Sequence, residues 1–166
     1  MNVLLLRNRQ KKCRTNLPLL RKVTRHLVRE IFPGRPFELA IHLVEEREMA
    51  ALNETFLQHE GSTDVITFNH AGVGAKITGP APSLAGEIFV CLPVAVRQAR
   101  QFRTAWQSEL VRYVVHGLLH LAGFDDLVPA GRRKMKRQEN RLVEWVSRIF
   151  PIAELKARPS RPSSRT

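Results

Sequence analysis

Apolar residues recur along the chain with two different periods, and the changes of period divide it into short strands and helices. Spacings of three and four residues predict helices at residues 16–31, 46–57, 93–102, 107–122 and 129–150. Alternating or β-branched runs predict strands at residues 2–9, 37–44, 64–68 and 87–92. Residues 69–85 are rich in Gly, Pro, Ala and Ser, which is typical of a loop.

The ends and inner faces of several helices can also be read from the pattern. Asn16 is a suitable N-cap, and Gly123 is a preferred residue just after a helix. In the helix at 46–57 we expect the inward residues to be Met49, Leu52, Asn53 and Phe56. In the helix at 129–150 we expect them to be Met135, Leu142, Val146 and Ile149.

Strands interspersed with helices predict a single α/β (α+β) domain, with a small mixed sheet of about four strands packed against helices. The 166-residue length fits one domain, which we place at residues 1–155. Residues 156–166 are rich in Pro, Ser and Arg, and we expect this basic tail to be disordered.

Composition narrows the class of protein. A hydrophobic content of 43% excludes a wholly disordered chain. No apolar run approaches the roughly 18 residues that span a bilayer, so we expect no membrane partner. Two cysteines cannot build a disulfide framework, and the N-terminus lacks the apolar core of a secretory signal, so we expect a cytoplasmic protein.

The formal net charge of +12 is concentrated at the two ends of the chain. Residues 1–29 hold nine Lys and Arg and no acid, whereas residues 30–130 hold more acids than bases. Basic surfaces attract nucleic acid through its phosphates, although many only keep a protein in solution. We favour RNA binding, and the candidate residues are Arg7, Arg9, Lys11, Lys12, Arg132 and Arg133.

A metal-binding pattern lies in residues 113–126, YVVHGLLHLAGFDD. His116 and His120 are four residues apart, which places both imidazoles on one face of a helix. A break at Gly123 would let the chain reverse and bring Asp126 to the same ion, with Asp125 as the rival ligand. Two imidazoles and one carboxylate leave open coordination positions, as hydrolytic metal sites require. We expect one divalent ion per chain, zinc being favoured.

The same spacing occurs in metzincin proteases, but the residue after the first histidine differs. Those enzymes carry a glutamate there as general base, and this chain has Gly117. Peptide hydrolysis is therefore disfavoured, while the metal ligands are retained.

The chain resembles the YbeY family of bacterial endoribonucleases. Residues 116–126, HGLLHLAGFDD, match the family signature up to its last position, and residues 62–68 and 86–98 are similar to two further family segments. Met135 and Glu139 fall where the family has Met and Glu in its last helix. The resemblance implies a small α/β domain that holds zinc or a similar divalent ion and cleaves single-stranded RNA. It also implies a role in maturing the 3′ end of small-subunit (16S) ribosomal RNA, with the ribosome as partner.

The chain departs from this family at two positions. Asp126 stands where the family usually has a third histidine, and a carboxylate ligand favours harder ions. Leu57 stands where the family usually has an arginine, for which His59 or Arg112 is a candidate replacement. A water at the open metal position is the expected nucleophile, and Glu87 is a candidate base or partner of a ligating histidine.

Two other functions remain open. One is a ribosome-associated RNA-binding factor whose metal is mainly structural, which the leucine at position 57 favours. The other is a metalloprotease, which the ligand spacing favours and Gly117 opposes.

Overall fold

The computed structural model describes residues 2–58, 61–71 and 84–160. The described residues form four strands, five α-helices and a short 3-10 helix, η1 (Ile152–Leu155). In chain order the other elements are β1 (Asn2–Asn8), α1 (Leu17–Ile31), β2 (Phe37–Val44), α2 (Glu46–Leu57), β3 (Val65–Asn69), β4 (Leu84–Cys91), α3 (Leu92–Phe102), α4 (Trp106–Leu121) and α5 (Pro129–Ile149).

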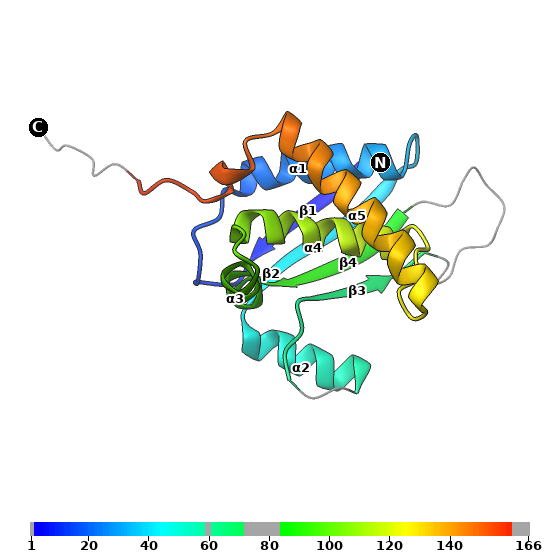
Figure 1. The fold of residues 1–166 in the computed structure, drawn as a ribbon, viewed down its shortest axis with the longest axis horizontal. Coiled ribbons are helices and arrows are strands. Elements are labelled where there is room, and N and C mark those ends of the chain that lie inside the picture. Colours follow the sequence, from blue (N-terminus) through cyan, green and yellow to red (C-terminus); the bar gives the residue numbers. More distant parts are fainter. Residues whose placement is uncertain (1, 59–60, 72–83, 161–166) are drawn as a thin grey trace, which may run out of the picture.

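The four strands form one mixed sheet in the order β1-β2-β4-β3 (Figure 1). β1, β2 and β4 are parallel, and β3 pairs antiparallel with β4 at one edge. The parallel pairs align Leu6 with Ile41 and Ile41 with Ile88, so their side chains point to the same face of the sheet. The α/β class, the single small domain and the mixed sheet predicted from the pattern are confirmed.

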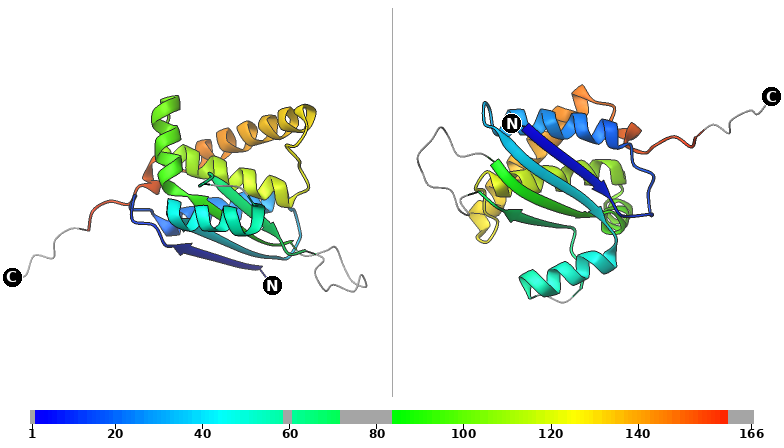
Figure 2. Two further views of the ribbon diagram at one scale, coloured as in Figure 1. Left: turned by 90° about the horizontal axis from the view of Figure 1, so that it is seen from below. Right: turned by 180° about the vertical axis from the view of Figure 1, so that it is seen from behind.

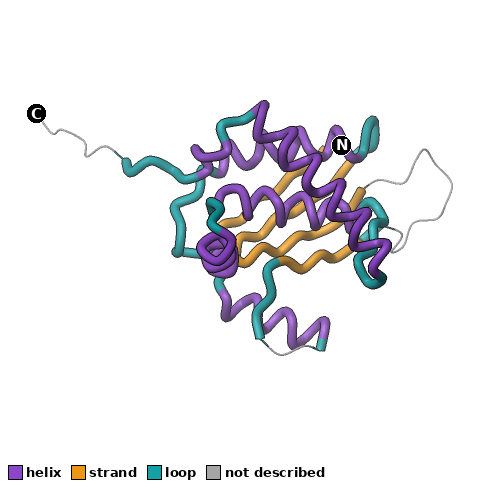
Figure 3. The backbone as a smooth tube through the Cα atoms, viewed as in Figure 1, coloured by secondary structure: helices purple, strands orange, loops and turns teal. Residues whose placement is uncertain are grey.

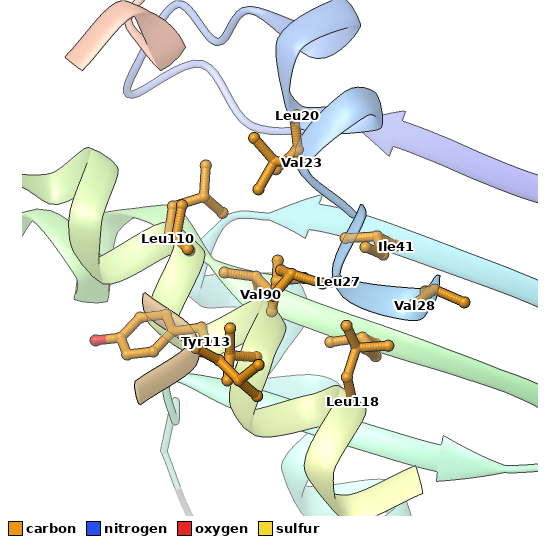
Figure 4. Close-up of a cluster of buried hydrophobic side chains, with 14 of the residues drawn as sticks. Leu20, Val23, Leu27, Val28, Ile41, Val90, Leu110, Tyr113 and Leu118 are labelled. Atoms are coloured by element: carbon orange, nitrogen blue, oxygen red, sulfur yellow. The ribbon is translucent and has the colours of Figure 1, made fainter. Parts of the chain in front are cut away.

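Helices α1, α4 and α5 lie on one side of the sheet, as the views in Figure 2 and the tube in Figure 3 show. Buried side chains between these helices and the sheet make the main core, part of which Figure 4 draws around Leu27, Val90 and Leu118. A smaller cluster on the opposite face joins α2 to the sheet through Met49, Ile66 and other residues. The site described below lies on the side covered by α4 and α5.

Some predicted boundaries and inward faces were wrong. β4 begins at Leu84 rather than at residue 87, because Leu84 continues the pairing with β2. Phe56 is 60% exposed, because the buried residues of α2 are Met49 and Asn53, and the ring of Phe56 packs edge-on against that of Phe68. Ile149 is 46% exposed because it is the last residue of α5.

The beginning of the predicted tail pairs with the segment before α1. Lys156 forms an isolated bridge with Thr15, and the N–H of Ala157 donates to the carbonyl of Arg14. Residues 161–166 of the predicted tail lie outside the described residues. Among the described helices, none is both long and apolar enough to cross a membrane.

Candidate metal centre

Helix α4 places His116 and His120 on one face, one turn apart, at its C-terminal end. Their Nε2 atoms are 3.0 Å apart. The neighbouring residues of α4, among them Val115 and Leu118, are buried in the core, and this packing fixes how the helix is rotated. The two imidazole rings are therefore only partly exposed and are held against each other.

A tight turn after α4 brings an acid to the two histidines. Gly123 has a φ of +96°, and its N–H donates to the carbonyl of His120. Past this turn, Asp126 Oδ2 lies 3.7 Å from His116 Nε2 and 3.8 Å from His120 Nε2. Asp125, the rival ligand, instead accepts the backbone N–H of Leu127 at 2.8 Å.

Hydrogen bonds at the Nδ1 atoms determine which tautomer each neutral histidine adopts. His116 Nδ1 lies 3.1 Å from a carboxylate oxygen of Glu139, and His120 Nδ1 lies 3.2 Å from the carbonyl of Phe124. Because these oxygens only accept, each neutral ring carries its proton on Nδ1. Both Nε2 atoms then present lone pairs toward each other and toward Asp126.

Three lone-pair donors facing one another repel unless a cation lies between them, and their arrangement fits a metal ion. The ligand atoms of His116, His120 and Asp126 all lie within 4.8 Å of one another. Zinc bonds of 2.0–2.2 Å in tetrahedral geometry separate neighbouring ligands by roughly 3.4 Å. The observed separations of 3.0, 3.7 and 3.8 Å bracket that value. These three residues could therefore hold a metal ion.

The carboxylate that orients His116 comes from α5. Glu139 is buried, with 7% of its side chain exposed, and it also accepts a hydrogen bond from Arg112 at 2.8 Å. Burial alone would raise the pKa of Glu139, but the hydrogen bonds from His116 and Arg112 and the nearby Lys136 together lower it to about 2. Glu139 is thus an anion that supports the imidazole from behind, as is common at metal sites.

Sequence reasoning had offered Glu87 for such a role, and the structure places it elsewhere. Glu87 lies on β4 between His42 and His70, at 3.4 Å from Nε2 of each. His59, another candidate, lies outside the described residues. The role of Glu139 was missed, although the resemblance had singled out its position, because nothing in the local spacing connects it to a histidine 23 residues away.

Arg112, in contrast, lies beside the ligands. It is one turn before His116 on α4, and its guanidinium donates to Glu139 and, at 2.7 Å, to Asn140. About a quarter of its side chain, 26%, stays exposed. Arg112 therefore presents a positive charge near the histidines, held in place from α5.

The basic residues proposed for RNA binding fall in two separate places. Arg7, Arg9, Lys11 and Lys12 lie at or beyond the end of β1, on the opposite side of the molecule from the C-terminal end of α4 (Figure 1). Arg9 is already bound to Glu48 and to the ring of His42. Arg132 and Arg133, the fourth and fifth residues of α5, line a cavity that His116 and Asp126 also line.

Gly117 faces the sheet, where a Cβ would come within 2.8 Å of the Ile88 side chain. This close approach of helix to strand leaves no room for the glutamate that zinc proteases carry after their first histidine. The position therefore serves packing and lies on a different face of α4 from the ligands.

Comparison with known proteins identifies the family of the chain. The family model for Endoribonuclease YbeY matches residues 5–147. The curated Endoribonuclease YbeY of Salinibacter ruber is 37% identical over 65% of this chain and 69% of its own length. The Endoribonuclease YbeY of Chlorobium luteolum is 34% identical, and the match covers 67% of this chain and 75% of that protein.

One solved structure has a similar fold. The solution structure of TM1509 from Thermotoga maritima is 25% identical, with a TM-score of 0.62, and the match covers 98% of this chain and 100% of that one. Together with the match of the family model along most of the sequence, these findings place the chain in the Endoribonuclease YbeY family.

Proposed function

We propose that this protein is a metal-dependent endoribonuclease that cleaves single-stranded RNA and acts in the cytoplasm. We further propose that its substrate is ribosomal RNA at the 3′ end of the small subunit (16S), and that its metal is zinc. The observation that carries the proposal is the convergence of three lone-pair donors, from His116, His120 and Asp126, at one partly exposed point. Membership of the family supports RNA as the substrate.

Each residue of the centre has a distinct task in this function. The two Nε2 atoms and the Asp126 carboxylate would hold the ion, with Glu139 keeping the His116 proton on Nδ1. A bound divalent ion supplies Lewis acidity toward a phosphoryl oxygen and acidifies water. Among the residues that the structure describes, three ligands converge, and a site with three protein ligands keeps coordination positions open to the substrate.

Arg112 supplies the positive charge that the family arginine would provide at position 57. Leu57 is 45% exposed at the end of α2 and carries no charge. Arg112 lies in the same cavity as the ligands, and its contacts with Glu139 and Asn140 fix its guanidinium. A fixed cation near a phosphate stabilises negative charge that develops during cleavage.

The second candidate is an RNA- or ribosome-binding factor whose metal is structural, which the uncharged Leu57 favours. Both candidates predict about one zinc ion per chain, so metal content alone does not separate them. They differ in whether the protein cleaves RNA and whether Arg112 contributes to cleavage.

The deciding experiment measures zinc content and RNA cleavage for the wild type, His120→Ala and Arg112→Gln. We expect cleavage of a single-stranded but not a duplex RNA, loss of cleavage with a chelator, and loss of zinc and cleavage in His120→Ala. Arg112→Gln should keep its zinc and cleave about a hundredfold more slowly. Stoichiometric zinc without any cleavage by the wild type would favour the binding factor, and a protein without zinc would contradict both.

A further inference from the structure

The cavity beside the candidate metal centre extends well past it, along helix α4. It has a volume of about 800 Å³, and one face of α4 forms its floor through Glu109, Arg112, Tyr113 and His116. These floor residues cover about 10 Å of helix, at 1.5 Å per residue. Helices α3 and α5 form the two walls, so the cavity is a groove that leads away from the histidines.

Four acidic side chains line this groove, and each has a partner within the protein. Asp64 accepts a backbone N–H at 2.8 Å, and Asp126 faces the two histidines of the candidate metal centre. Glu139 pairs with Arg112 and Lys136. Glu109 is 8% exposed and accepts a hydrogen bond from the Thr104 hydroxyl at 2.9 Å. Since the acids have partners within the protein, the charge that remains for a ligand is positive.

That positive charge comes from Arg132 and Arg133 at the beginning of α5. Both side chains are exposed, and neither forms an ion pair with any residue in the described parts of the chain. The first turn of α5 contains no acid. Positive side chains are unfavourable there because the N-terminal end of a helix dipole is itself positive. Two arginines at this end therefore destabilise the helix when no ligand is bound, and a bound anion would offset their charge.

The far end of the groove carries an exposed aromatic ring. Phe102 is 63% exposed and is the last residue of α3, which Arg103 ends in a left-handed conformation with a φ of 54°. Thr104, two residues later, is bonded to Glu109 on the floor of the groove. Phe102 therefore lies at the end opposite His116, with its backbone fixed by the helix end.

We propose that this groove is the path of the RNA strand, in which Arg132 and Arg133 bind phosphates while one unpaired base stacks on Phe102. The distance along α4 corresponds to about three stacked nucleotides at 3.4 Å each. Stacking on an aromatic side chain requires a base whose face is free, so the groove selects single strands. This inference rests on the proposed function, because it takes the strand held here to be the one cut at the histidines.

The first test measures how RNA affinity depends on salt. The probe is a fluorescein-labelled, 12-nucleotide single-stranded RNA, and binding is followed by anisotropy at 4 °C between 50 and 300 mM KCl. Arg132→Ala/Arg133→Ala should lower the slope of log affinity against log salt by about 0.7 for each lost phosphate contact, or about 1.4 in all. The matched control is Lys22→Ala/Arg29→Ala, which removes two exposed charges from α1 and should leave the slope unchanged.

The second test examines stacking. Phe102→Ala should weaken binding by about 5- to 150-fold. Phe56→Ala is the control, because Phe56 is similarly exposed at 60% but lies on α2, outside the groove. A set of RNAs, each with one abasic position, should show one position where the missing base weakens wild-type binding and has no further effect in Phe102→Ala.

The outcomes separate this inference from the proposed function. Equal effects of the groove and control variants on binding would overturn the groove, even if the protein cleaves RNA at the histidines. The expected losses of binding, found in a protein that does not cleave RNA, would support the groove and contradict the nuclease. A greater loss in Phe56→Ala than in Phe102→Ala would place the strand near α2 and overturn the inference.

Discussion

The described part of the molecule contains two clusters of histidines and a carboxylate, and only one of these two is arranged to hold a metal ion. On α4, the Nε2 atoms of His116 and His120 and the carboxylate of Asp126 converge on one point. On the sheet, His42 and His70 lie on either side of Glu87, each 3.4 Å from a different carboxylate oxygen. The same residue types are present, but in the sheet cluster the acid separates the two rings.

The difference follows from the backbone that carries each cluster. A helix returns to the same face every three to four residues, so two side chains of one segment can point at one ion. On the sheet, His42 and Glu87 come from two neighbouring strands, β2 and β4, while His70 follows β3. His42 is also 5% exposed, stacks on Phe89 and contacts Arg9, which disfavours a cation there.

Removal of a single histidine gives the sharpest contrast between the clusters. His116→Ala or His120→Ala should reduce zinc from about one ion per chain to a small fraction, because two ligands hold zinc far more weakly than three. His42→Gln should keep its zinc. Elemental analysis after gel filtration measures both, and circular dichroism checks that each variant folds. Zinc retained by a His116→Ala/His120→Ala double variant would contradict the assignment.

Of the two glutamates that contact histidines, Glu139 should affect zinc affinity and Glu87 should not. Glu139→Gln removes the anion behind His116, and zinc affinity should fall by about 10- to 100-fold. Glu87→Gln should leave zinc affinity unchanged, because Glu87 contacts histidines outside the centre. Competition with a chromophoric chelator measures both affinities. Equal losses in the two variants would mean that the sheet cluster also influences the metal.

The identity of the third ligand, at position 126, should affect which metal ion is preferred more than whether an ion binds. Asp126→His should keep about one zinc per chain and shift preference away from manganese, because imidazole favours zinc and carboxylate favours harder ions. Titration with zinc and manganese gives the two dissociation constants. Asp125→Ala is the control and should change neither, since its side chain bonds to the backbone of Leu127. If the ratio of the zinc and manganese dissociation constants were the same in Asp126→His as in the wild type, Asp126 would be excluded as a ligand.

The smallest effect concerns the stability of the sheet cluster at different pH. Burial, together with the charge of Arg9, lowers the pKa of His42 below its usual 6.5, and the bonds with Glu87 only partly offset this. Below pH 6.5, His42 is therefore protonated more readily in the unfolded chain than in the folded protein. This difference should reduce the free energy of unfolding as pH falls below 6.5 and should have no effect well above that pH. Urea unfolding at pH 7.5 and 5.5 should show a larger decrease for the wild type than for His42→Gln. An equal decrease in both would mean that His42 does not titrate differently on folding.

Much of the fold could be read from the sequence because each element has a local signal. The periods of apolar residues predicted four strands and five helices in the right order. The errors fell where packing decides: Phe56 and Ile149 have helical spacing but are 60% and 46% exposed in the folded protein. β4 began earlier than predicted because pairing with β2, rather than composition, sets its first residue.

The sequence by itself determined the core of the candidate site, since His116, His120, Gly123 and Asp126 lie within eleven residues and helix geometry followed by a glycine turn brings them together. Tertiary structure alone decided what surrounds them. It paired Glu139 with His116, separated Glu87 from the ligands, and aligned Phe102 with Arg132 and Arg133 along one groove. These residues come from different elements, and no periodicity within one segment reports how two helices pack.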